Sequence, residues 1–239
     1  MTSLLSLVRA LRFRLWALAL RARLHRAGGR LVLQAPGGTP RFHALPHVEV
    51  ERLGGDGGTL TLSLGRDCKL GRDLVLEVWA GADNRLELGD RATLESWCRV
   101  QLQGGAVVLG SDVHVRDLCL LKSKSSLTVG DRTVLSRGVN VHATTGVAIG
   151  ARCGIGERTS IIDSDHTHDG SDGFALDAPL RTGPIALGDN VLVSANCVLL
   201  RGATVGPNAV VGAGAVVRSG EYPGRSLVAG SPAEVVREL

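Results

Sequence analysis

The feature that most constrains the fold is a six-residue period of aliphatic side chains in the C-terminal part of the chain. The period runs through Leu187, Val193, Leu199, Val205, Val211 and Val217, and Ile149, Ile155 and Ile161 repeat the same spacing. An α-helix repeats every 3.6 residues and a strand alternates every two, so neither has this period. A parallel β-solenoid with one hexad on each flat side of a coil does. An ordinary valine-rich β protein is the alternative, and six successive matches argue against it.

A longer repeat indicates where the coils begin and where one of them is interrupted. An aliphatic residue followed by glycine returns at Gly89, Gly110, Gly130 and Gly150 in steps of 21, 20 and 20 residues, and again from Gly188 to Gly206 in a step of 18. Glycine is expected there because it permits a tight turn. The step from Gly150 to Gly188 is 38 residues. It therefore predicts one coil plus an inserted loop, which begins in the stretch IIDSDHTHDG.

Composition narrows the class of protein further. Aromatic residues make up 3% of the chain and glycines number 32, which suits a narrow aliphatic interior rather than a sandwich or barrel core. The net charge is +4, and basic residues concentrate near the N-terminus, so a general nucleic-acid surface is not expected. The five cysteines are far apart and form no CxxC pair. Buried, reduced thiols are expected, and they indicate the cytoplasm.

Residues 1–45 are expected to form a basic helical segment, separate from a β-helix domain over residues 46–239. The stretch LLSLVRALRFRLWALALRARLHR contains helix formers, no glycine or proline, and arginines between leucines. Such a helix could cover the open end of the solenoid, which a repeat array needs. It could also make a peripheral contact through residues 4–26 with an anionic membrane, on its inner face. The sequence leaves both interpretations open.

The inserted loop carries the residues best suited to chemistry. Asp163, Asp165, His166 and His168 lie within six positions of one another. Histidine titrates near neutral pH, so His166 could act as a general base. Asp163, Asp165 or Glu157 could orient it. A metal site drawn from the same histidines and acids, with His142 as a third histidine, is the competing interpretation.

The C-terminal residues resemble a known family. The string GDNVLVSANCVLLRGATVGPNAVVGAGAVV and the following AGSPAEVVR are similar to the hexapeptide-repeat acyltransferases, in the galactoside, maltose and polysaccharide O-acetyltransferase branch. The resemblance is strong over roughly 130–239 and repeat-like over 60–130. It implies a left-handed parallel β-helix with an N-terminal helical segment, an extruded catalytic loop, a short C-terminal helix at PAEVVREL, and assembly as a homotrimer.

The resemblance also implies a reaction. Acetyl-CoA would be the acyl donor, a saccharide hydroxyl the acceptor and His166 the general base, with no metal required. An N-acyltransferase acting on an amino sugar and a binding solenoid without catalysis are the alternatives. The implied coenzyme A contacts are Ser194, Ala195, Gly212 and Ala213 along the pantetheine, and Arg218 and Arg237 at the phosphates. The implied acceptor contacts are Asn140, His142 and His168.

Overall fold

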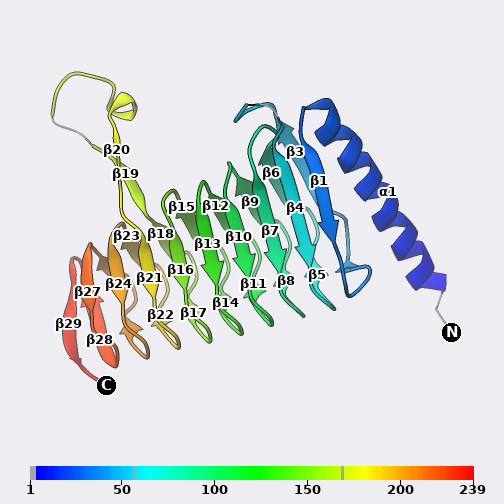
Figure 1. Ribbon diagram of the computed structural model, residues 1–239. Helices are drawn as coiled ribbons and strands as arrows, with labels where there is room; N and C mark the ends of the chain where they lie inside the picture. Colours follow the sequence, from blue (N-terminus) through cyan, green and yellow to red (C-terminus); the bar gives the residue numbers. More distant parts are fainter. Residues whose placement is uncertain (1–3, 56, 168–169) are drawn as a thin grey trace.

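The chain folds as a parallel β-solenoid covered at one end by a long helix (Figure 1). The computed structural model describes residues 4–55, 57–167 and 170–239. Helix α1 (Leu4–Arg26) lies at the N-terminal end, and the coils follow one another to the C-terminal end (Figure 1). The predicted parallel β-helix is confirmed.

Each complete coil contributes one strand to each of three sheets. Sheet A contains β1 (Arg30–Gln34), β4 (Thr59–Leu64), β7 (Asn84–Leu88), β10 (Ala106–Leu109), β13 (Ser126–Val129), β16 (Val147–Ile149), β21 (Ile185–Leu187), β24 (Ala203–Val205) and β27 (Gly220–Tyr222). Sheet B contains β2 (Arg41–Phe42), β5 (Lys69–Leu70), β8 (Thr93–Leu94), β11 (His114–Val115), β14 (Val134–Leu135), β17 (Gly154–Ile155), β22 (Leu192–Val193), β25 (Val210–Val211), β28 (Ser226–Gly230) and β29 (Ala233–Glu238). Sheet C contains β3 (His47–Glu51), β6 (Val75–Trp79), β9 (Arg99–Leu102), β12 (Leu120–Ser123), β15 (Asn140–Ala143), β18 (Ser160–Ile162), β23 (Val198–Leu200) and β26 (Val216–Val217).

Three corners join the strands of a coil, and we name them after the sheets they connect. The A–B corner leads from sheet A to sheet B, and the B–C and C–A corners follow in chain order. Asn190, Asn196 and Asn208 occupy corner positions with φ of 58°, 59° and 61°. This left-handed conformation is one that asparagine tolerates better than most residues.

The hexad residues form the core, as the period predicts. All nine are buried, and none is more than 4% exposed. Neighbouring coils stack them in register, so that Ile149 pairs with Leu187 and Leu187 with Val205. The narrow column leaves no room for aromatic rings, which accounts for their scarcity in the chain.

The recurring glycine after the aliphatic residue has a different cause from the one expected. Gly150 and Gly188 do not have positive φ, so no tight turn requires them. A Cβ on Gly150 would lie 2.6 Å from the carbonyl carbon of Gly188, and a Cβ on Gly188 would lie 2.6 Å from the nitrogen of Pro207. Glycine recurs because the backbone of the next coil passes too close for a side chain.

The solenoid begins earlier than the predicted boundary at residue 46. Strands β1 and β2 pair with β4 and β5, so residues 30–42 already belong to the first coil. The turn-rich segment of residues 35–40 hides this coil from the repeat pattern. Helix α1 packs Phe13, Leu20 and Leu24 into the same core. The interpretation of the helix as a cover for the open end is confirmed. Among the described residues, no helix combines the length and apolar character needed to cross a bilayer.

The predicted C-terminal helix is wrong. Residues Ala233–Glu238 form β29, which runs antiparallel to β28 and pairs Gly230 with Ala233 and Val228 with Val235. Strand β28 would otherwise end sheet B with an open edge, and an unpaired edge favours the addition of a strand. This tertiary demand outweighs the helix-forming composition of the segment.

Candidate active site at the coil exit

The predicted extruded loop leaves the solenoid as a hairpin between β18 and β21. Strand β19 (Ser164–His166) pairs antiparallel with β20 (Leu180–Thr182), and a short 3₁₀ helix, η1 (Ala175–Asp177), lies between them. Figure 1 shows this segment projecting well beyond the coils. The hairpin therefore fixes residues 164–166 at a defined place, at the C–A corner.

His166 is exposed on β19, and its side chain makes one hydrogen bond within the part of the chain that the structure describes. Its Nδ1 lies 3.0 Å from the carbonyl oxygen of Ala178. A carbonyl oxygen can only accept, so Nδ1 must carry the proton in this bond. In the neutral ring Nε2 then holds the lone pair, and it is the atom available to accept a proton from a ligand. The group that orients His166 in this structure is a backbone carbonyl, not one of the predicted acids.

Asp163 has a structural environment. The side chain is fully buried, and its carboxylate accepts hydrogen bonds from the N–H groups of Thr144 at 2.7 Å, Thr145 at 2.7 Å and Gly146 at 2.8 Å. The Thr145 hydroxyl donates a fourth at 3.1 Å. The carboxylate thus joins the start of the hairpin to the C–A corner of the preceding coil. It makes no contact with His166 among these bonds, so its position suits support of the coil exit rather than orientation of the base.

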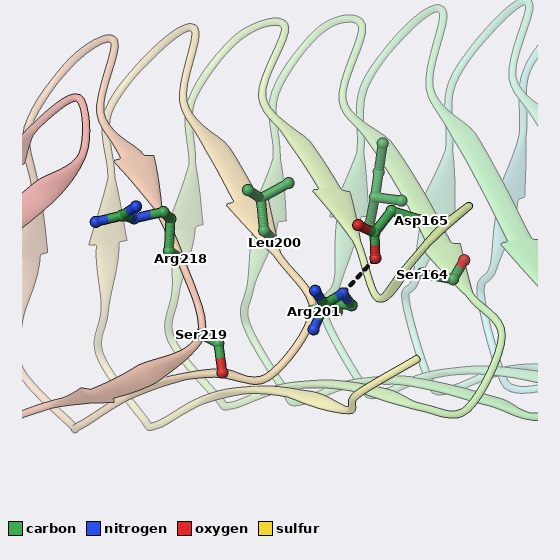
Figure 2. A pocket seen from close by; sticks show the side chains of 7 residues that line it. Ser164, Asp165, Leu200, Arg201, Arg218 and Ser219 are labelled. Carbon is green, nitrogen blue, oxygen red and sulfur yellow. Dashed lines mark hydrogen bonds and ion pairs between the residues drawn. The ribbon is translucent and has the colours of Figure 1, made fainter. Parts of the chain in front are cut away.

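Asp165 points to the side of β19 opposite that of its neighbour His166, because successive side chains on a strand alternate. It forms an ion pair with Arg201, which follows β23 (Figure 2). This pair connects the extruded hairpin to the next coil. Asp165 therefore positions the hairpin rather than the imidazole.

A cavity of about 350 Å³ lies beside this ion pair. Ile162 and Leu200 supply apolar surface, and the polar lining comes from Ser164, Asp165, Arg201, Arg218 and Ser219 (Figure 2). Arg218 takes part in none of the ion pairs found among the described residues. The cavity thus offers an apolar surface and a cationic side chain available for a ligand.

The predicted pantetheine contacts lie at the B–C corner. In two early coils a side chain of the following coil accepts a hydrogen bond from the backbone N–H at this corner. Ser96 Oγ accepts from the Arg72 N–H at 3.1 Å, and Asp117 Oδ1 accepts from the Ser96 N–H at 3.1 Å. The equivalent positions in the last coils are Ala195 and Ala213. Within the described part of the chain, no hydrogen bond occupies either alanine N–H. Among the described residues the equivalent N–H groups of Asp117, Arg137 and Glu157 have no acceptor either, so open backbone donors run along this corner from Asp117 to Ala213.

The predicted acceptor residues lie one coil before the hairpin. Asn140 and His142 are half-buried on the outward side of β15, and His142 is aligned between Lys122 and Ile162. Burial lowers the pKa of His142, Lys122 lowers it further, and Asp163 opposes them. The neutral ring is favoured. His168 lies outside the described residues.

Most of the predicted residues lie at two different corners, the B–C and C–A corners at opposite ends of the sheet C strands. Ser194 and Ala195 precede β23, whereas His166 leaves the solenoid after β18, and β18 and β23 are neighbours. Arg218 follows β26 and so lies at the C–A corner, as His166 does. Arg237 lies on β29 of sheet B, where it donates to the Glu238 carbonyl at 3.1 Å. One chain therefore does not gather the predicted base and the predicted pantetheine contacts into a single cleft.

Sequence reasoning missed Arg201, the Ala178 carbonyl and the apolar surface of the cavity. A signal existed for the surface, since Ile162 and Leu200 each follow a buried hexad residue and so face outward on adjacent coils. The Ala178 contact depends on how the loop folds back, which no residue type reveals.

The five cysteines are free and buried, as predicted. Burial raises the pKa of the Cys68 thiol to about 11. Thiols in this state are poor nucleophiles.

No group of three or more histidine, cysteine, aspartate or glutamate side chains suited to a metal occurs in the described residues.

Residues 184–219 match the model of the bacterial transferase hexapeptide, in its six-repeat form. The predicted resemblance to hexapeptide-repeat transferases is confirmed. Over 168 residues the chain is 24% identical to the putative colanic acid biosynthesis acetyltransferase WcaF of Escherichia coli (strain K12), covering 70% of this chain and 89% of that protein. The WcaF protein of Shigella flexneri gives the same values.

Several solved structures are similar to this chain. A mutant of AntD, an N-acyltransferase from Bacillus cereus in complex with dTDP and coenzyme A, superposes with a TM-score of 0.50 at 15% identity, over 74% of this chain and 83% of that one. A hexapeptide-repeat acetyltransferase from Vibrio cholerae complexed with acetyl coenzyme A has a TM-score of 0.43 at 29% identity, over 47% and 60% of the two chains. The polysialic-acid-specific acetyltransferase NeuO has a TM-score of 0.41 at 20% identity, over 87% and 86%.

Proposed function

We propose that this protein is an acetyl-CoA-dependent O-acetyltransferase that acts on a saccharide of a cell-surface polysaccharide or its precursor. The observation that carries the proposal is His166 at the coil exit, with Nδ1 bonded to Ala178 and Nε2 without a hydrogen bond to any described residue. The hexapeptide repeats over residues 184–219 and the similarity to a putative colanic acid biosynthesis acetyltransferase support both the reaction and the acceptor class.

The reaction needs one base and donors for a developing oxyanion. The acceptor hydroxyl attacks the thioester carbonyl carbon, and His166 Nε2 takes the hydroxyl proton as the C–O bond forms. The carbonyl oxygen gains negative charge, which backbone N–H groups can stabilise. The C–S bond then breaks, the proton passes to the thiolate, and the products are the acetyl ester and free coenzyme A. The Nδ1–H bond to Ala178 stabilises the imidazolium while it carries the extra proton.

The B–C corner is our candidate for holding the acyl donor. The open N–H groups of Ala195 and Ala213 repeat from one coil to the next, which matches a ligand with carbonyl acceptors at intervals, such as pantetheine. Gly212 and Ser194 add little bulk beside them. Arg218 and Arg237 offer guanidinium groups for phosphates, on sheets C and B respectively.

We further propose that the site forms between copies of the chain in a homotrimer. The base lies at the C–A corner and the proposed donors lie at the B–C corner, at the other end of the sheet C strands. A neighbouring copy could bring its B–C corner to the C–A corner that carries His166. Closed symmetric assembly repeats such a contact at every interface. The reduced thiols suit the cytoplasm, where we expect the reaction to take place.

A coenzyme A release assay with saccharide acceptors tests the proposal. Replacing His166 with Ala should lower kcat by about 10²–10⁴-fold, because general-base catalysis contributes that much. Coenzyme A binding, measured by calorimetry, should remain. His47→Ala removes another exposed imidazole away from the hairpin and should keep full activity. Equal activity of His166→Ala and wild type would contradict the role of His166, and transfer only to amino sugars would redirect the proposal to N-acylation.

A further inference from the structure

Helix α1 is apolar on two opposite faces, and only one of them packs against the solenoid. The packed face carries Phe13, Leu20 and Leu24, which are buried against the first coil. Trp16 on the same side stacks on Phe13 and donates its Nε1–H to the Pro46 carbonyl at 3.0 Å. This face holds most of the helix against the solenoid, and Arg12 over the Phe42 ring and the hydrogen bond from Arg52 to the Arg26 carbonyl add to it.

The opposite face is an exposed stripe, made of Leu4, Val8, Leu11, Leu15 and Leu18. Their spacings of four, three, four and three residues place them on one line along a helix. Their exposed fractions are 77%, 48%, 58%, 56% and 57%. Single exposed leucines are ordinary on protein surfaces, but a continuous row of five marks an interaction site.

Arginines border this outer stripe on both sides. At 100° per residue, Arg12 and Arg23 fall on one flank and Arg14 and Arg21 on the other. The sequence has no acidic residue before Glu49, and none of the ion pairs among the described residues involves Arg14, Arg21 or Arg23. The flanks thus carry unbalanced positive charge.

We propose that the outer stripe and its arginines bind the surface of an anionic bilayer, with α1 lying in the plane of the headgroups. The leucines enter the boundary of the acyl chains while the guanidinium groups reach lipid phosphates, which is the arrangement that interfacial helices adopt. A second copy of α1 is a poorer occupant, because two such stripes would bring arginine rows together without any acid to offset them. Anionic lipid is complementary to both features.

The position of α1 makes this contact compatible with catalysis. The helix lies at the N-terminal end of the solenoid, and the extruded hairpin belongs to coils nearer the other end (Figure 1). A bilayer against the outer stripe would therefore leave the corner that carries His166 in water.

Vesicle co-sedimentation of the full chain tests the proposal. Wild type should bind vesicles of phosphatidylcholine with phosphatidylglycerol at least about tenfold more tightly than phosphatidylcholine alone, because each arginine near an anionic surface contributes roughly fivefold. Leu11→Ser/Leu15→Ser should weaken binding about tenfold or more, since two apolar side chains no longer leave water. Arg14→Gln/Arg21→Gln should weaken binding about twentyfold, and only to the anionic vesicles.

Leu118→Ser/Leu192→Ser is the matched control, because these leucines are 56% and 52% exposed and lie on coils that do not contact α1. This variant should bind as wild type does. Equal vesicle binding by wild type and the Leu11→Ser/Leu15→Ser variant would overturn the proposal. So would an absence of vesicle binding by wild type, or a stripe variant that changes only the mass of the assembly in sedimentation velocity.

Discussion

The early coils and the last coils share one backbone geometry but treat the B–C corner in opposite ways. Around Ser96, side chains from the following coil accept hydrogen bonds from the corner N–H groups. Around Ala195 and Ala213, the same N–H groups face no side-chain acceptor. The first two corners therefore satisfy their own backbone, whereas among the described residues the corner is open from Asp117 onward, and its last two donors, at Ala195 and Ala213, are the ones we propose for a ligand.

The junction between the two regions depends on Asp163, so its replacement should have the largest effect on stability. Asp163→Ala leaves three corner N–H groups without their acceptor, and we expect a loss of about 3 kcal/mol, since an unsatisfied buried donor costs about 1–3 kcal/mol. Urea unfolding followed by circular dichroism measures this loss. Asp165→Ala is the control: its ion pair is largely exposed and should contribute about 1 kcal/mol at most.

Introducing at the last coils a side-chain acceptor like the one that Asp117 supplies should occupy an N–H group that we propose for coenzyme A. Ala213→Asp places a carboxylate where Asp117 stands in its own coil, and it would accept from the Ala195 N–H. We expect coenzyme A to bind about tenfold more weakly or worse, because its carbonyl loses a donor and its phosphates meet a new negative charge. Calorimetric titration measures the affinity. Unchanged affinity would mean that the open corner has no part in donor binding.

The reverse change should affect stability and leave activity alone. Ser96→Ala removes the acceptor of the Arg72 N–H, which should destabilise the fold by about 1 kcal/mol. Coenzyme A affinity and the rate of acetyl transfer should match wild type. A loss of donor binding in this variant would break the division between the two regions.

A small pH effect is expected from His142. Burial lowers its pKa in the folded chain, so between that value and about 6.5 the unfolded chain binds one proton more than the folded chain does. Its contribution to stability is therefore complete above pH 6.5 and declines as the pH falls below it. Unfolding free energies of wild type and His142→Gln at several pH values isolate this slope. Parallel curves for the two proteins would contradict it.

The fold was predictable because the six-residue period of aliphatic residues identifies the buried column of the solenoid directly from the sequence. On each side of the inserted loop, from Ile149 to Ile161 and from Leu187 to Val217, the buried hexad residues obey one spacing rule, and that rule needs no knowledge of distant contacts. The C-terminal strand was not predictable in the same way. Ala233–Glu238 pairs because β28 presents an open edge, and this edge exists only after the coils have stacked.

The candidate site was predictable in part. Histidine chemistry and the long step between glycines point to His166 at a coil exit. The roles of the two nearby acids were not separable, because Asp163 and Asp165 are the same residue type within three positions of His166 and differ only in what the fold places around each carboxylate. One is buried on backbone N–H groups and the other pairs with Arg201.

The central claim is that the open N–H groups of the last coils bind the acyl donor. Residue-resolved amide hydrogen exchange, with and without coenzyme A, tests it most directly. Coenzyme A should slow exchange at Ala195 and Ala213 by about tenfold or more, while Arg72 and Ser96, already capped, should not change. Equal exchange rates at Ala195 and Ala213 in the two states, under conditions where coenzyme A is bound, would contradict the claim.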